Sequence, residues 1–148
     1  MRRAELLSIL AVAGLVLDGC GASALSISQL RVTATRICNV AESRADDIPT
    51  PATPAAGAIF LRRGVDAFSP ELRELQTLRV SGGPSHTYAA ALAAASSELV
   101  AIRSALRTLS TGGDPLNTIK RLERRLAPRE ARANIAWQTL GIPACESR

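Results

Sequence analysis

The side chains with the widest chemistry in this chain are the thiols of its three cysteines, Cys20, Cys38 and Cys145. A thiol can be acylated, can pair with a second thiol or can ligate a soft metal ion. Metal binding is disfavoured, because His86 is the only histidine and no cysteine lies at the short spacing of a metal motif. The sequence therefore predicts no metal site and no cofactor, and the use of each cysteine depends on its compartment.

The N-terminal residues have the composition of an export signal. Arg2 and Arg3 precede an apolar run over residues 6–17, which is too short to span a bilayer. The sequence Leu17-Asp18-Gly19-Cys20 resembles the lipobox of bacterial lipoproteins, although Asp18 places a charge where that motif usually has a small uncharged residue. This resemblance implies cleavage before Cys20 and lipidation of its thiol.

Two processing routes define the expected domain boundaries. Lipidation gives a signal peptide over residues 1–19, a tether over 20–25 and a helical domain over 26–148, with the protein on the extracytoplasmic face of the cell membrane. The alternative is a signal peptide over residues 1–24, because Ala22-Ser23-Ala24 has the small-residue pattern that ordinary signal peptidases accept. Cleavage after Ala24 would release a secreted protein.

Either route leaves Cys38 and Cys145 as an even pair in an exported chain. Thiols in an oxidising compartment tend to pair, so we expect a disulfide between these two residues. The loop that it closes has roughly a hundred residues, for which the chain-entropy treatment gives about 4 to 5 kcal/mol of stabilisation. That is comparable with the whole stability of a small domain.

The elements that must position these residues are helical, because apolar residues recur at steps of three and four between residues 26 and 140. Turns or stops are predicted at residues 46–51, 81–84, 111–113 and 141–143. Pro70 and Pro128 lie within the second and fourth helical segments, and Ser69-Pro70-Glu71 is typical of a helix restart. Because short connections force neighbouring helices to be antiparallel, we predict an all-α, antiparallel up-down-up-down four-helix bundle with kinked second and fourth helices.

The apolar stripes indicate which face of each helix is buried. The expected faces are Leu30, Ala34, Ile37, Cys38 and Ala41; Leu61, Val65, Phe68, Leu72 and Leu75; Tyr88, Leu92, Ala95, Leu99, Ile102, Leu106 and Leu109; and Leu116, Ile119, Leu122, Leu126, Ala133, Trp137 and Leu140. Cys38 therefore faces the core. The tail after Gly141 can turn back along the first helix and bring Cys145 to Cys38.

The sequence gives little support for a catalytic role of any side chain. His86 lies at the start of the third helix, where a solvated role is sufficient explanation. Glu71 and Glu74 share a helix face, but after Pro70 they fit the electrostatics of a first helical turn. The sequence therefore predicts no catalytic residue and no enzymatic activity.

The chain has a net charge of +5, and the fourth helix carries a basic stripe. Its members are Lys120, Arg121, Arg124, Arg125, Arg129 and Arg132. A solvated outward face is the simpler interpretation; the alternative is contact with anionic lipids, envelope polymers or an acidic protein. Nucleic-acid binding is not expected, because no aromatic side chains interleave with these charges and the chain is exported.

The segment from Ala133 to Cys145 is similar to the tail of small exported helical proteins of high-GC Gram-positive bacteria, a resemblance that implies no catalytic residue. We therefore expect a lipid-anchored helical bundle of the cell envelope that acts as a binding or structural module without catalysis. The alternative is a secreted or tethered carrier that holds a small apolar ligand in the bundle interior.

Overall fold

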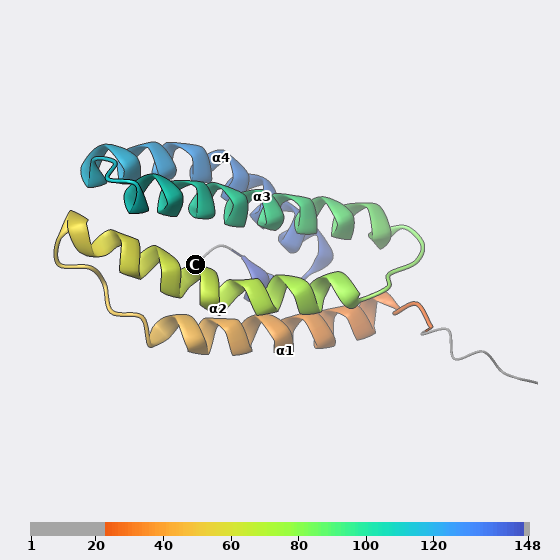
Figure 1. Ribbon diagram of the computed structural model, residues 1–148. Helices are drawn as coiled ribbons and strands as arrows, with labels where there is room; N and C mark the ends of the chain where they lie inside the picture. Colours follow the sequence, from red (N-terminus) through yellow and green to blue (C-terminus); the bar gives the residue numbers. More distant parts are fainter. Residues whose placement is uncertain (1–22, 147–148) are drawn as a thin grey trace, which may run out of the picture.

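The computed structural model describes residues 23–146, and these residues form a bundle of long helices (Figure 1). The helices are α1 (Ile27–Asp46), α2 (Gly57–Thr77), α3 (Pro84–Ser110) and α4 (Pro115–Leu140), with short 3-10 helices η1 (Pro54–Ala56) before α2 and η2 (Pro143–Cys145) after α4. Within the described residues, strand-like pairing is limited to an isolated bridge between Leu25 and Val80. The prediction of an all-α antiparallel four-helix bundle is confirmed. The expected signal peptide over residues 1–19, Cys20 and the first half of the expected tether lie outside the described residues.

Local sequence explains where the helices begin and end. Ser26 and Gln29 form a capping box at the start of α1. The Asp114 carboxylate accepts the Asn117 backbone N–H at 2.7 Å, which caps α4 as the sequence predicts. Gly141 ends α4 in the left-handed region, with a φ of 72°, a conformation that glycine adopts without steric penalty.

Of the two alternatives at Ser69, one kinked helix or a break with a restart, the structure excludes the break. Helix α2 is continuous through Pro70, and α4 is continuous through Pro128. Ser69 is buried within α2, where its hydroxyl donates to the Val65 carbonyl oxygen at 2.5 Å and accepts from Arg103 at 2.8 Å. These bonds occupy the side chain that would otherwise cap a new helix, and Pro70 removes only one backbone donor from the helix.

The helices do not pack evenly around the bundle axis. Helix α3 packs most extensively with α4, and α2 packs with both α3 and α1. Direct packing between α1 and α4 is slight, and η2 contacts both of them instead. The Arg31 Nε also donates to the Leu140 carbonyl oxygen at 2.7 Å, which joins α1 to the end of α4. The C-terminal segment therefore takes the place of a fourth helix–helix interface.

Buried side chains form two separate clusters. The disulfide core comprises Leu30, Ala34, Ile37, Cys38, Leu75, Tyr88, Ala91, Ala133, Ala136, Trp137, Leu140, Ile142 and Cys145. The distal core comprises Leu61, Ala101, Ala105 and Leu122. All of the largest fully buried side chains belong to the disulfide core, whereas the distal core contains no residue of α1. The distal core is thus the smaller of the two clusters, and α1 contributes no buried side chain to it.

The predicted faces agree with burial to different degrees. All five residues expected on the inner face of α1 are buried. Leu116 of α4 was expected to point inward but is 50% exposed, because it lies in the first turn at the edge of the bundle. On α3, Ala91, Ala101 and Ala105 are buried beside the predicted stripe, since this helix packs against neighbours on two sides.

Candidate functional site

A cavity of about 580 Å³ lies between the two cores. Side chains from α1, α2, α3, α4 and the C-terminal segment line it, and its volume is within the range of small-molecule sites. Its best-buried lining residues are Leu75, Leu99, Ala133 and Trp137, whereas Phe60 is 38% exposed and lies at the opening. Direct packing between α1 and α4 is slight, and the tail that contacts both of them also contributes Cys145 and Glu146 to the lining.

Within residues 23–146, every charged side chain that lines the cavity is acidic. Glu71 comes from α2, Glu98 from α3 and Glu130 from α4, while Asp46 and Glu146 come from the end of α1 and the tail. This composition is the opposite of that of the whole chain, which has 18 basic and 13 acidic residues. The cavity therefore combines an apolar wall with a concentration of negative charge.

Glu98 is a strongly perturbed carboxylate in this lining. Its Oε1 atom is buried and has no hydrogen-bond partner among the described residues. The pKa of this carboxyl is raised to about 7, mainly by burial and then by the charge of Glu130, while Arg129 opposes the shift and Glu71 adds to it. An unsatisfied buried oxygen is costly, so this atom is suited to a hydrogen-bond donor that enters the cavity.

Arg129 lies beside the cavity but is engaged elsewhere. Its Nε donates to the Ser97 hydroxyl at 2.7 Å, and a terminal nitrogen donates to the Arg125 carbonyl oxygen. Arg129 is not among the residues that line the cavity. The guanidinium thus partly offsets the charge of Glu98 without occupying the place of a ligand.

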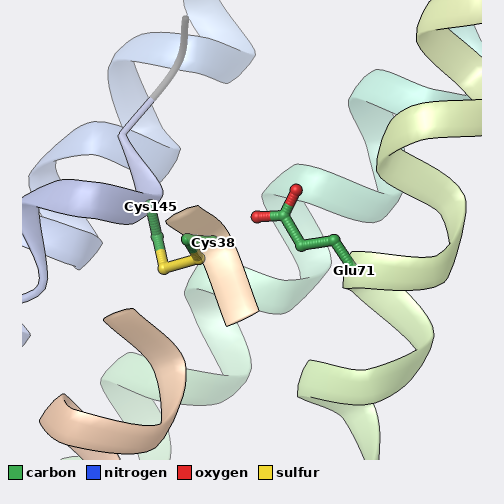
Figure 2. A group of neighbouring side chains, drawn as sticks. All are labelled: Cys38, Glu71 and Cys145. Carbon is green, nitrogen blue, oxygen red and sulfur yellow. A yellow bond between two sulfur atoms is a disulfide. The ribbon is translucent and has the colours of Figure 1, made fainter. Parts of the chain in front are cut away.

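Cys38 and Cys145 form the predicted disulfide beside the cavity (Figure 2). The two Cα atoms are 5.2 Å apart, and Cys145 lines the cavity. The Glu71 carboxylate is directed toward the two cysteines, and one of its oxygens lies within 4.8 Å of both sulfur atoms. Bonded sulfurs are not thiolates, so in the oxidised protein these three residues do not make a soft-metal site.

Trp137 connects the cavity to the disulfide core. It is the only tryptophan of the chain, it is 2% exposed, and it lines the cavity. Tyr88 packs edge-on against it, with ring centroids 6.0 Å apart. A ligand in the cavity would therefore lie against a single intrinsic fluorophore.

Only part of the basic stripe predicted on α4 forms one exposed surface. Lys120, Arg121, Arg124, Arg125 and Arg132 are exposed, but Arg129 is partly buried and turned toward α3. The Arg132 Nε donates to the Pro128 carbonyl oxygen at 2.9 Å. The structure therefore retains an exposed basic surface, which we call the α4 basic surface, made of the five exposed residues.

The other candidate residues that the sequence suggested do not lie together in the structure. His86 is exposed and does not line the cavity. Glu71 lines the cavity, whereas Glu74 is exposed, and neither begins a helix because α2 is continuous there.

Sequence reasoning missed Glu98 and Glu130. The available signal was their spacing: Glu98 lies three residues after Ala95 and four before Ile102, and Glu130 lies four after Leu126. Each carboxylate therefore shares a helix face with apolar residues.

One described helix, α3, has the length and composition of a membrane span, with a mean hydropathy of 1.3 in its most apolar window. The core helix of a soluble bundle can have the same properties, so this helix by itself does not indicate membrane insertion.

Comparisons of the chain with protein-family models, with curated proteins and with solved structures gave no match, so the assignment of function rests on the cavity itself.

Proposed function

We propose that this protein is an exported, lipid-anchored binding protein that holds a small, largely apolar ligand in the cavity between its two cores. The observation that carries the proposal is the cavity of about 580 Å³, lined by Trp137, Leu75, Leu99 and Ala133 and bordered by a few polar groups. Apolar cavities with few convergent polar groups are the usual form of ligand sites. Of the two functions expected from sequence, this supports the ligand carrier over a purely structural module.

Binding without catalysis fits the chemistry of the lining. Among the described lining residues there is no histidine, and the one cysteine, Cys145, is held in the disulfide. Paired carboxylates alone can transfer protons, but no nucleophile with an adjacent base accompanies them. The residues present can position and neutralise a ligand, which is the role we propose for them.

The membrane anchor in this proposal depends on Cys20 and is tested separately. We expect protein recovered from the membrane fraction of a bacterial host that processes lipoproteins to have an N-terminal peptide that begins at an acylated Cys20. Intact mass and peptide sequencing measure this directly. A soluble product that begins at Leu25 would contradict the anchor and would favour a secreted carrier.

The cavity is tested with a variant that fills it. Gly64 lines the cavity, and a Cβ atom added to it meets nothing within 4 Å, so Gly64→Phe directs a ring toward open space without a backbone clash. Gly83→Phe is the matched control, because Gly83 also has open space around it but lies outside the cavity lining. Circular dichroism establishes that both variants remain helical.

The probe for this test is 1-adamantylmethanol, a compact neutral molecule that does not fluoresce. We expect it to bind with one-to-one stoichiometry by calorimetry and to change the fluorescence of Trp137. The wild type and Gly83→Phe should bind equally well, and Gly64→Phe should lose at least about tenfold in affinity because the ring occupies the site. Equal affinity in all three proteins would mean that the probe does not enter this cavity.

A second candidate function is contact with an anionic surface. It is favoured by the exposure of the α4 basic surface, since a tethered domain would hold these arginines within the screening length of lipid headgroups. Sedimentation with vesicles of phosphatidylglycerol and phosphatidylcholine tests it. Charge reversal at Arg121 and Arg125 should weaken binding to the anionic vesicles, and unchanged binding would remove this candidate.

A further inference from the structure

We propose that the cavity selects an organic cation, an ammonium group attached to a compact apolar body, with Glu98 and Glu130 as its counter-charges. This inference rests on the proposed function, because it names the chemical class of the ligand for the same cavity. It goes beyond that function in assigning a sign of charge and two specificity-determining residues, Glu98 and Glu130.

The first argument is charge complementarity. Among the described residues, five acidic and no basic side chains line the cavity, in a chain whose net charge is +5. Glu71, Glu98 and Glu130 come from three different helices, so they converge through the fold and do not reflect a local run of acidic sequence. Fixed negative charges in a partly apolar site favour a cation and repel an anion.

The second argument is the hydrogen-bonding state of Glu98. Its Oε1 atom is buried and has no hydrogen-bond partner in the part of the chain that the structure describes, whereas most buried polar atoms in folded proteins are paired. An ammonium group has three donors and no acceptor, so it can satisfy this oxygen and neutralise the carboxylate at once. A neutral apolar ligand would leave the oxygen unsatisfied.

The third argument is the apolar remainder of the cavity. A bare metal ion requires several oxygen ligands in a small shell. Here the carboxylates border a wall formed by Trp137, Leu75 and Leu99, and the volume exceeds what one ion needs. Aromatic faces also attract cations, so Trp137 adds to the same preference. The chemistry therefore fits an amphiphilic organic cation better than a metal.

The charged groups near Glu98 define how pH acts on this site. Asp46 in α1, Glu71 in α2, Glu130 in α4 and Glu146 in the tail add negative charge, while Arg129 opposes them. Arg103 of α3 is engaged with Ser69. Acidification from pH 8 to pH 5.5 protonates Glu98, whose pKa is raised to about 7, and removes its counter-charge, so we expect a cation to bind more weakly at pH 5.5 than at pH 8.

The experiment compares three probes of similar shape on the purified protein at pH 8: 1-adamantylmethylammonium, 1-adamantylmethanol and 1-adamantanecarboxylate. An alkylammonium keeps its proton at this pH, as lysine does. Because a hydrogen bond to a charged group contributes about 1.5 to 3 kcal/mol, we expect the ammonium to bind about 10- to 100-fold more tightly than the alcohol. The carboxylate should bind most weakly.

Matched variants test whether the preference for the ammonium probe arises in the cavity. Glu98→Gln should reduce the ammonium-to-alcohol ratio by about tenfold and leave the affinity for the alcohol nearly unchanged. Glu74→Gln removes the same charge from an exposed position of α2 and should retain the wild-type ratio. Lowering the pH to 5.5 should reduce the ratio in the wild type more than in Glu98→Gln.

The outcomes separate the two proposals. If the alcohol and the ammonium bind equally well, and Gly64→Phe weakens both, the cavity is a ligand site but the inferred cation selectivity is wrong. If the ratio falls equally in Glu74→Gln and Glu98→Gln, the preference comes from overall charge and the assignment to the cavity is wrong. If none of the three probes binds, both this inference and the proposed function are overturned.

Discussion

The two cores of the bundle are stabilised in different ways. The disulfide core contains the covalent link, the largest fully buried side chains and residues of α1, α2, α3, α4 and the tail. The distal core contains four buried residues from α2, α3 and α4, surrounded by partly buried leucines and isoleucines. The cavity lies between them. One end is thus held closed by the disulfide-linked tail, whereas the other end lacks such a link.

This contrast explains how a small bundle can keep an internal cavity. Close packing normally excludes voids, and an unfilled cavity lowers stability. Here the disulfide and the buried Trp137 stabilise one end strongly, which can offset incomplete packing in the middle. Four perturbations test the contrast.

Removing the disulfide should have the largest effect. The Cys38→Ala/Cys145→Ala double variant opens a link across 107 residues, and we expect a loss of about 4 to 5 kcal/mol in the free energy of unfolding. Urea denaturation measures the loss, and reduced wild-type protein is the control that should match it. Hydrogen exchange should show α1 losing protection before the distal core. A loss below about 1 kcal/mol, or uniform loss of protection, would contradict the contrast between the two ends.

Truncation of one large side chain in each core should come next. Trp137→Ala removes the largest fully buried side chain, and we expect a loss of about 3 to 5 kcal/mol. Leu122→Ala in the distal core should lose about 2 to 3 kcal/mol, toward the low end for leucine because that cluster is less completely buried. Thermal and urea unfolding measure both variants. A larger loss of stability for Leu122→Ala than for Trp137→Ala would show that the distal core is the more stable end.

Glu98 gives a pH-dependent test at the cavity itself. Its folded-state pKa of about 7 lies above the ordinary value of 4.5, so the folded protein retains a proton that the unfolded chain releases. Stability should therefore be undiminished below about pH 4.5 and should decrease as the pH rises toward 7. Glu98→Gln should lack this decrease and be more stable at pH 8 by about 1 to 2 kcal/mol, a discounted value because the carboxyl is partly solvated.

Urea denaturation of the two proteins at pH 5 and pH 8 measures this difference. The Glu74→Gln variant is the control, since its exposed carboxylate should change stability little at either pH. An equal pH dependence in the wild type and Glu98→Gln would show that another group causes it.

Much of the fold could be predicted from sequence because it depends on local periodicity and helix caps. The inner face of α1, the cap at Asp114 and the stop at Gly141 all follow from residue types a few positions apart. The disulfide was predictable from cysteine number and expected export. Ser69 shows the limit of this reasoning, because its hydroxyl bonds to Val65 and to Arg103, a residue on another helix.

The candidate site was harder to predict because it depends on how the helices are spaced. Glu71, Glu98 and Glu130 are far apart in sequence and lie near one cavity only because α2, α3 and α4 converge there. The slight packing between α1 and α4 also has no local signature, since it depends on where the tail lies. Acidic residues on apolar helix faces were the visible sign, and only the packing shows that they converge.

The smallest expected effect concerns Tyr88, which joins α3 to the end of α2 in the disulfide core. Its buried hydroxyl donates to the Leu75 carbonyl oxygen at 2.6 Å, and burial raises the pKa of the phenol above its ordinary value. Tyr88→Phe removes this bond but keeps the edge-on ring contact with Trp137. Because the Leu75 carbonyl also accepts the Leu78 backbone N–H at 3.1 Å, it is not left unpaired.

We therefore expect Tyr88→Phe to lower the free energy of unfolding by only about 0.5 to 1 kcal/mol, near the lower end for a buried hydrogen bond. Urea denaturation compares the free energy of unfolding of this variant with that of Leu122→Ala. It therefore tests how much a single hydrogen bond contributes to the disulfide core. A small loss would show that the disulfide core tolerates removal of one polar contact because packing and the covalent link dominate its stability. A loss above about 2 kcal/mol would show that this end depends on its hydrogen bonds as much as on its disulfide.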